Sequence, residues 1–366
     1  MKKIRCIFIY SVFFLILTLI MTACSIKTKS DDLTEKKAFT SSKVIQYDSP
    51  EPIENDSQAS FEHLQYTQGK VPKIAYLPPA TEFNFYMAIG QGIKSASAKL
   101  GVDTFMLAPQ SGEDINGQIS LLEEVIENKV DAIILSTLDD KKEAPLIKKA
   151  VDQGIVVIIV NSDFKNFPTP IHGIVGYKQS SGTKSIGEYA ANLAKGNAME
   201  VGIIEGSPGY LSTERCGGFL EGIKNSSNLN VKASADGQWN VEGGKAAALS
   251  MLKANPNIKM MFAANDYEII GAQKAAEEMG RNDIIFLGND GDTSCFEAIA
   301  ANKVTATVSA SPFNTGEIAL QVAVEALNKS FKGGYVEIPT KIVDKSNVMD
   351  YLKHPETLYP SPLKIY

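Results

Sequence analysis

The 366-residue chain has few of the residues that build metal centres and covalent active sites. Its four cysteines and three histidines form neither a CxxC pair nor a Cys/His cluster with the spacing of metal ligands. It has no G-x-S-x-G turn and no P-loop, and the "GQG" at 90–92 lacks the third glycine of a dinucleotide-binding motif. We therefore expect no catalytic residues, no metal and no cofactor, which argues against an enzyme.

A strong charge of either sign is also absent. The formal net charge of −6 gives no reason to expect nucleic acid as a partner. With 44% hydrophobic and 21% charged residues, the composition is typical of a soluble globular protein. The length suits two domains of ordinary size, each able to bury a core.

One long apolar run stands near the N-terminus. Lys2, Lys3 and Arg5 precede "CIFIYSVFFLILTLIMTA", and Cys24 follows it. This order is typical of a signal peptide, and "MTAC" resembles the bacterial lipoprotein signal, in which residues 1–23 are removed and the cysteine is lipidated. The alternative is an uncleaved anchor helix, since about 20 apolar residues can span a bilayer. Both interpretations place the rest outside the cytoplasmic membrane, and we favour lipid on Cys24 as the anchor.

The other two segments of unusual composition lie at the two ends. Residues 24–71 are polar and rich in Ser, Lys, Asp and Glu, so we expect a flexible tether with a docking segment around "VIQY" at 44–47. Residues 344–366 are expected to form a solvated tail or an additional docking surface.

Cys216 and Cys295 each lie in a helix-like stretch. They either form a disulfide or, as we favour, are two small buried hydrophobic residues.

From Lys73 onward, short apolar runs alternate with amphipathic segments. Runs of four to seven apolar residues, such as "KIAYL" and "IVVIIV", are separated by segments with helical spacing. This alternation predicts βαβ units and parallel sheets. Because it restarts after about residue 177 and is too long for one sheet, we expect an α/β protein of two doubly wound lobes.

Several of the predicted strands end in amides or carboxylates. Asn161, Asn265 and Asp290 each close an apolar run, with Asp163 two residues after the first. Ligands of open parallel sheets bind beyond the carboxyl ends of the strands. The alternative is that these side chains cap the following helices. Three such ends favour a shared ligand site, with capping as a second role for some of them.

An ordered set of segments carries a resemblance to a known family. Together they resemble the type I periplasmic binding proteins of the ribose/galactose/xylose branch, over about Lys73 to Val343; the segments are "KIAYL", "FYMAIGQGIKSASAKLG", "DAIILSTLD", "GIVVIIVNSD", "ERCGGFLEGI", "MFAANDYEIIGA" and "FLGNDGD". The resemblance implies two lobes joined by a three-crossing hinge near Gly176, Ser311 and Pro339. The implied boundaries are an N-terminal lobe at 72–176 plus 311–338, a C-terminal lobe at 177–310, and the last crossing and tail at 339–366.

The resemblance also implies a ligand site for a sugar. The residues at the matching positions are Phe85, Tyr86, Asn161, Asp163, Arg215, Trp239, Asn265 and Asp290. Carboxylates, amides and Arg suit sugar hydroxyls, and aromatic rings suit the apolar faces of the sugar. Trp239 is either the aromatic that covers the sugar or an ordinary core residue, and Asp266 is expected to cap the helix that follows it.

Three positions depart from the pattern of the ribose binders. Phe83 stands in place of an Asn, Asn161–Ser162 in place of an Asp-Arg pair, and Ala310 in place of a Gln. These changes predict a different sugar or polyol; the candidate replacements are Glu82, Asn84, Asp140 and Asn314.

We therefore predict an extracytoplasmic, lipid-anchored protein that captures a pentose or hexose by closure of two lobes. Its partner would be the permease of an ABC importer or, alternatively, the ectodomain of a membrane histidine kinase in a sensing role. A transcription regulator of the same fold would need a basic helix-turn-helix at its N-terminus, where this chain has the apolar run.

Overall fold

The computed structural model describes residues 45–353. The expected signal peptide, the lipidation site Cys24 and the end of the predicted tail (354–366) lie outside the described residues. Within the described part, no helix combines the length and the hydropathy needed to cross a membrane.

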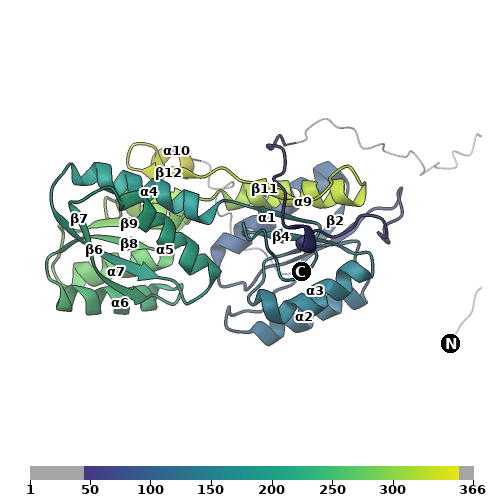
Figure 1. Ribbon diagram of the computed structural model, residues 1–366, viewed down its shortest axis with the longest axis horizontal. Coiled ribbons are helices and arrows are strands. Elements are labelled where there is room, and N and C mark those ends of the chain that lie inside the picture. Colours follow the sequence, from purple (N-terminus) through teal and green to yellow (C-terminus); the bar gives the residue numbers. More distant parts are fainter. Residues whose placement is uncertain (1–44, 354–366) are drawn as a thin grey trace, which may run out of the picture. The chain divides into compact units, whose positions relative to one another are not determined.

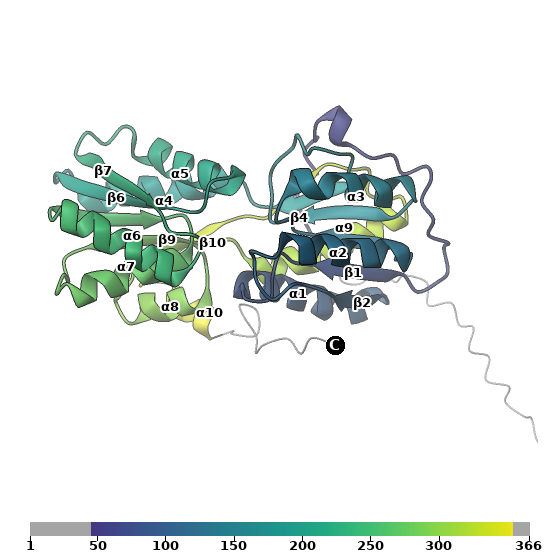
Figure 2. The same ribbon diagram turned by 90° about the horizontal axis from the view of Figure 1, so that it is seen from below.

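The first lobe is a six-stranded parallel sheet with helices on both faces (Figure 1). The strands run in the order β11-β5-β4-β3-β1-β2; they are β1 (Lys73–Leu77), β2 (Asp103–Met106), β3 (Ala132–Leu135), β4 (Val156–Val160), β5 (Gly173–Gly176) and β11 (Tyr335–Glu337). Alternate strand residues enter two separate cores. Helices α1 (Asn84–Leu100) and α9 (Pro312–Leu327) cover one core, and α2 (Ile115–Glu127) and α3 (Asp140–Asp152) cover the other (Figure 2).

The second lobe repeats this plan, with one antiparallel strand at the edge. The strands run in the order β12-β10-β9-β8-β6-β7; they are β6 (Met199–Glu205), β7 (Leu229–Asp236), β8 (Ile258–Ala263), β9 (Ile285–Asp290), β10 (Ala306–Ser309) and β12 (Lys341–Asp344). One face carries α4 (Gln179–Ala194) and α5 (Tyr210–Ile223). The other carries α6 (Val241–Ala254), α7 (Asp266–Glu278), α8 (Thr293–Ala300) and α10 (Val348–Leu352).

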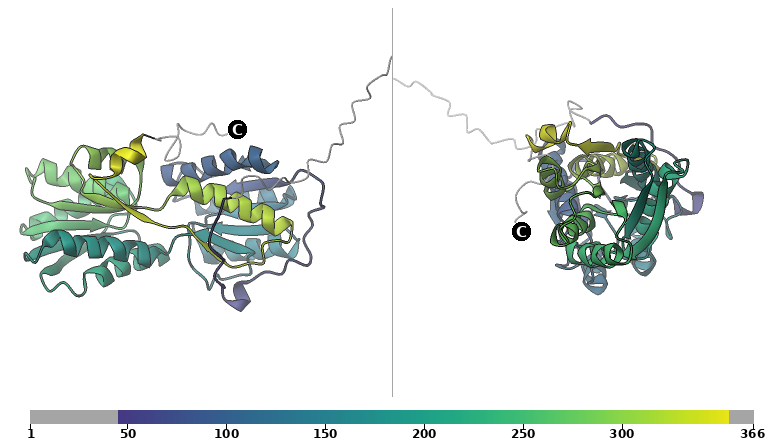
Figure 3. Two further views of the ribbon diagram at one scale, coloured as in Figure 1. Left: turned by 90° about the horizontal axis from the view of Figure 1, so that it is seen from above. Right: turned by 90° about the vertical axis from the view of Figure 1, so that its left-hand side faces the viewer.

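The chain passes between the two sheets three times. It leaves the first sheet after β5, returns after β10 and leaves again after β11, so the crossings fall at residues 177–178, 310–311 and 338–340. Figure 3 shows the last of them as the yellow segment that leads from β11 to β12. The predicted fold class, two doubly wound lobes joined by a three-crossing hinge, is confirmed.

The prediction of a flexible tether is wrong for residues 45–71, which are ordered against the first lobe. Ile53 and Ala59 are buried in the first lobe, and Ser57 forms a short 3-10 helix, η1 (Asn55–Ser57), with its neighbours. The backbone of Glu51 pairs with Tyr335 at the edge of the first sheet. Few apolar residues are needed to order a polar segment when its backbone groups find partners of this kind.

The beginning of the predicted tail also belongs to the second lobe. Strand β12 pairs antiparallel with β10, and Val348 of α10 is fully buried. The ring of Tyr351 packs against Phe296, with ring centroids 5.1 Å apart. Residues 344–352 of the predicted tail are therefore not a solvated extension. Cys216 and Cys295, whose pairing was left open, are free.

Candidate functional site

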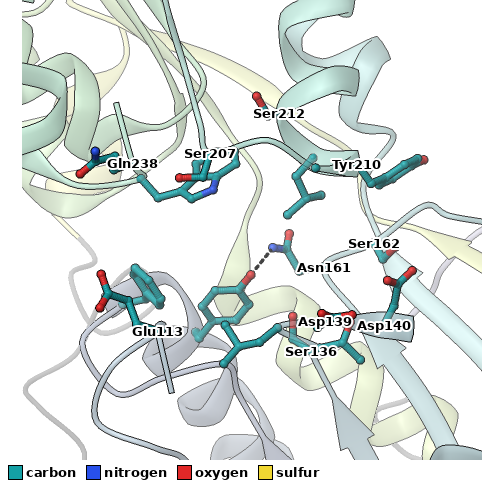
Figure 4. Close-up of a pocket in the computed structure, with 18 of the residues that line it drawn as sticks. Glu113, Ser136, Asp139, Asp140, Asn161, Ser162, Ser207, Tyr210, Ser212 and Gln238 are labelled. Atoms are coloured by element: carbon teal, nitrogen blue, oxygen red, sulfur yellow. Dashed lines mark hydrogen bonds between the residues drawn. The ribbon is translucent and has the colours of Figure 1, made fainter. Parts of the chain in front are cut away.

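A cavity of about 1190 Å³ lies beyond the carboxyl ends of strands from both sheets. Ser136 and Asn161 directly follow β3 and β4 of the first lobe, while Ser207 and Gln238 lie two residues after β6 and β7 of the second. Figure 4 shows these side chains around one opening. The placement agrees with the rule that ligands of parallel sheets bind beyond the strand ends.

Asn161 is the polar centre of the first-lobe wall. Its Nδ2 donates to Tyr86 Oη at 3.0 Å, as the dashed line in Figure 4 marks. The residue is 5% exposed, and its buried Oδ1 has no hydrogen-bond partner. A buried acceptor at a cavity wall costs free energy unless something donates to it. The backbone at Asn161 has φ +56°, a conformation that Asn adopts more readily than most residues.

Trp239 forms the opposite wall, in the second lobe. Its backbone N–H donates to Glu268 Oε1 at 2.9 Å, and its carbonyl accepts from Asn265 Nδ2 at 3.1 Å. A Cβ on Gly206 would lie 2.1 Å from the indole ring, so the ring packs directly over that glycine. Trp239 also lines the cavity. That it covers a sugar stays a prediction.

Arg215 and Asp290 lie behind this wall and not on the cavity surface. Arg215 is 3% exposed and its Nη1 lies 3.0 Å from Asp290 Oδ1. Its Nε donates to Gln179 Oε1 at 2.8 Å, and its guanidinium sits between the rings of Tyr177 and Trp239. Burial raises the pKa of Asp290 to about 6, against the lowering effect of Arg215. These two predicted site residues meet, and they support the aromatic wall from behind.

Asn265 and Asp266 have structural partners. Asn265 caps α7 in a capping box with Glu268, as the capping alternative proposed. Asp266 does not cap this helix, which corrects that expectation. Its carboxylate instead accepts from the backbone N–H groups of Gly291 and Asp292 at 2.8 and 2.7 Å. The loop after β9 carries these donors, so Asp266 fixes the position of the strand end that holds Asp290.

The predicted role of Phe85 as a ligand-binding residue is also corrected. It is 6% exposed and packs in the core between α1 and the first sheet, while Phe83 and Tyr86 line the cavity. Residues three apart share a helix face, so positions 83 and 86 point one way and position 85 points another. The sequence identified the aromatic run correctly and assigned one member to the wrong face.

Asp163 closes the side of the cleft where the lobes meet. Its Oδ1 accepts from Tyr210 Oη of the second lobe at 3.0 Å, and its Oδ2 accepts from the backbone N–H of Gln179 at 2.9 Å. Phe164 packs against Tyr210, with ring centroids 4.8 Å apart. Burial raises the pKa of Asp163. This carboxylate joins the lobes and is not among the residues that line the cavity.

Several cavity residues were not among the predicted site residues. Glu82 and Asp140 were named as candidate replacements, and both line the cavity. Tyr210 and Tyr267 were missed, although each is at the start of a helix that follows a strand end. The position of these tyrosines shortly after a predicted strand end could have identified them from the sequence. Asn84 contributes its backbone N–H, which donates to Tyr267 Oη at 3.4 Å.

The cavity is lined by acidic and not by basic side chains. Within the described part of the chain, its charged lining residues are Glu82, Glu113, Asp139, Asp140, Asp236 and Glu242, with no Lys or Arg among them. They do not form a cluster that could hold a metal ion within residues 45–353. The resulting negative potential disfavours anionic ligands.

Residues 74–330 match the model of a family described as "Periplasmic binding protein domain". The chain belongs to this family. The predicted membership of the type I periplasmic binding proteins, in the ribose branch, is thus confirmed.

Individual relatives of this periplasmic binding protein agree. The D-ribose/D-allose-binding protein of Pseudomonas aeruginosa is 29% identical over 288 residues, which cover 74% of this chain and 88% of the relative. The D-allose-binding periplasmic protein of Escherichia coli is 27% identical over 256 residues, 66% of this chain and 80% of the relative. The crystal structure of an ABC transporter periplasmic solute binding protein from Actinobacillus succinogenes with bound D-allose has a TM-score of 0.72 and 26% identity, and covers 76% of this chain and 100% of that one. All three of these relatives are named as binding proteins.

Proposed function

We propose that this periplasmic binding protein captures a small uncharged sugar, a pentose or a hexose, in the cleft between its lobes. The observation that carries the proposal is the unpartnered, buried Oδ1 of Asn161 at the wall of a cavity lined from both lobes. The relatives named for ribose and allose support the same ligand class.

The lining suits a sugar on chemical grounds. Asn161 Oδ1 is an acceptor for a ligand hydroxyl, and Ser136, Ser207 and Gln238 offer groups that donate or accept. Tyr86 and Trp239 present ring surface from opposite lobes to the apolar faces of a pyranose or furanose. The six carboxylates in the lining disfavour sugar acids and sugar phosphates.

Binding would be coupled to closure of the lobes. The cavity of about 1190 Å³ exceeds the roughly 300–1,000 Å³ of typical small-molecule pockets. A monosaccharide would contact both walls only after they approach one another across the hinge. The ligand then favours the closed population because it makes its full set of contacts only there.

The family and the N-terminal sequence support a proposal for the location and the partner. We place the protein outside the cytoplasmic membrane, held there by lipid on Cys24, and its partner is the permease of an ABC importer. The ectodomain of a histidine kinase stays a prediction from the sequence. A Cys24→Ser variant is expected to leave the membrane fraction; retention there as an uncleaved chain would instead support the anchor helix.

Calorimetric titration with a panel of sugars tests the ligand class. D-ribose, D-allose, D-xylose and D-galactose represent neutral pentoses and hexoses, and D-glucuronate represents the anionic sugars. We expect saturable one-to-one binding of at least one neutral sugar and none of glucuronate. Binding of glucuronate in preference to all neutral sugars, or of no sugar at all, contradicts the proposal.

A further inference from the structure

The segment before the family domain wraps the first lobe. We call residues 45–66 the belt; Figure 1 shows it as the purple segment that passes α9 and β11. Near its beginning, the backbone of Ile45 exchanges two hydrogen bonds with the side-chain amide of Gln321, at 2.8 and 3.1 Å. The hydroxyl of Tyr47 donates to Glu325. The described part of the predicted docking segment, residues 45–47, therefore binds α9 of its own chain.

The belt next holds the loop that follows β4, residues 161–168, which we call the cleft loop. Glu51 Oε2 lies 2.5 Å from Lys165 Nζ. Ser57 Oγ donates to the carbonyl of Phe167 at 2.8 Å, in a buried position. The backbone N–H of Glu54 also donates to the carbonyl of Lys165 at 3.0 Å. The cleft loop is thus fixed from its outer side by an ion pair, a buried side-chain hydrogen bond and a backbone hydrogen bond.

Glu51 also reaches the hinge. Its Oε1 lies 2.8 Å from the Nζ of Lys178, which belongs to the first crossing. Lys178 Nζ also lies 2.8 Å from Glu337, the last residue of β11 before the third crossing. The hydroxyl of Tyr335, whose backbone pairs with Glu51, donates to the carbonyl of Gly176 at 3.0 Å. One carboxylate therefore connects the cleft loop with two of the three crossings.

What the belt holds is the part of the first lobe that meets both the ligand and the second lobe. The cleft loop begins with Asn161, which lines the cavity and has a buried, unpartnered Oδ1, and Phe164 also lines the cavity. Asp163 and Phe164 both contact Tyr210 of the second lobe. A displacement of this loop would move an acceptor for the ligand and the contact between the lobes together.

We propose that Glu51 is a positioning residue for ligand capture, acting through Lys165 and Lys178. The belt lies before residues 74–330, which match the family model. The two lysines lower the pKa of Glu51 to about 2, so the carboxylate stays charged under all working conditions. A cleft loop that is already ordered costs less conformational entropy when the ligand arrives. The effect on ligand affinity rests on the proposed function, whereas the effect on the loop does not.

Hydrogen exchange of the ligand-free protein tests the positioning directly. Glu51→Gln breaks both ion pairs and keeps the shape of the side chain. The matched control is Asp283→Asn, since Asp283 also pairs with two cations, Lys259 and Arg281, and is similarly exposed, but lies in the second lobe before β9. We expect amides at 161–167 and 177–178 to exchange about threefold to tenfold faster in Glu51→Gln and not in the control. Equal exchange in both variants, or faster exchange spread over the whole first lobe, overturns the proposal.

Affinity gives the second readout, with the neutral sugar that binds the parent protein. Glu51→Gln should raise its Kd about threefold to tenfold with little change in Tm, and Asp283→Asn should leave Kd unchanged. Ser57→Ala, which removes the bond to Phe167, should act in the same direction as Glu51→Gln. An unchanged Kd in Glu51→Gln overturns the proposal. If no sugar binds the parent protein, the proposed function fails, and the exchange experiment still decides whether the belt positions the loop.

Discussion

The two walls of the cleft are built in different ways. In the second lobe, Trp239 is held by its backbone, packs over Gly206 and is supported by the buried pair Arg215 and Asp290. In the first lobe, the central polar group is Asn161, whose Nδ2 donates to Tyr86 while its buried Oδ1 has no hydrogen-bond partner.

This difference assigns different tasks to the two walls. A wall whose groups are already paired is pre-organised, and removing one member leaves the others unsatisfied. A wall with a free buried acceptor gains a hydrogen bond when a ligand arrives. We therefore expect changes in the second wall to act mainly on stability, and changes in the first wall to act mainly on ligand affinity.

The largest expected effect is that of Asp290→Ala. It would leave the guanidinium of Arg215 buried without its carboxylate partner, which typically costs about 3–5 kcal/mol. Urea or thermal unfolding measures the loss. Asp283→Ala removes an exposed carboxylate with two cationic partners and should cost no more than about 1 kcal/mol. Similar losses in both variants would show that the second wall is not the stable framework described above.

The sequence predicted the features that depend on residues close together in the chain better than those that depend on residues far apart. The alternation of apolar runs and amphipathic segments is local, so the two-lobed fold followed from it. Asn161 and Trp239 were found because strand ends and family positions are read along the chain. Phe85 was misassigned because a rotation of one residue decides which face of a helix meets the cavity.

The belt shows where sequence reasoning failed and why. Its polar composition predicted disorder. A polar segment that docks on distant residues can have the same composition as a disordered one, so composition alone does not distinguish the two. Ile45 contacts Gln321, 276 positions away, and Glu51 contacts Lys178, 127 positions away. No local pattern reports partners at such separations.

The second expected effect is a dependence of stability on pH that originates in the second lobe. Burial raises the pKa of Asp266 to about 7 and that of Asp290 to about 6. Between pH 4 and these values the folded protein keeps protons that the unfolded chain has lost, so the stabilisation is present at the acidic end and is lost as pH rises. In the first lobe, Glu143 (raised to about 7) acts in the same direction, while His172 (lowered to about 4) opposes it.

We therefore expect the free energy of unfolding to fall by roughly 2–4 kcal/mol between pH 5 and pH 8. Denaturant titrations at several pH values measure this slope. In Asp266→Asn, which cannot titrate, the slope should decrease, whereas a His172→Gln variant should steepen it between pH 5 and 6.5. A stability that rises over the whole interval contradicts the assigned protonation of the second lobe.

The third prediction tests the packing of the second wall. A methyl group on Gly206 would overlap the indole of Trp239, so Gly206→Ala should cost about 1–3 kcal/mol and displace the ring. Because Trp239 is the only tryptophan, its emission spectrum reports the displacement without interference. The control is Gly217→Ala in α5, where an added methyl group meets no atom within 4 Å and should be neutral or slightly stabilising. An unchanged spectrum in Gly206→Ala would mean that the ring is not seated on the glycine.

The smallest effect on stability, and the sharpest test of the first wall, is expected for Asn161→Gly. Glycine accepts the positive φ of this position without strain, so the variant removes the side chain and leaves the backbone as it is. The lost hydrogen bond to Tyr86 should cost only about 1 kcal/mol of stability. Affinity for the sugar should nevertheless fall about tenfold or more, because the free acceptor at the cavity wall is gone. Calorimetry and thermal unfolding on the same sample separate the two quantities. If affinity stays within twofold of the parent while stability falls by several kcal/mol, Asn161 belongs to the framework, and the two walls do not differ in the way that their hydrogen bonds indicate.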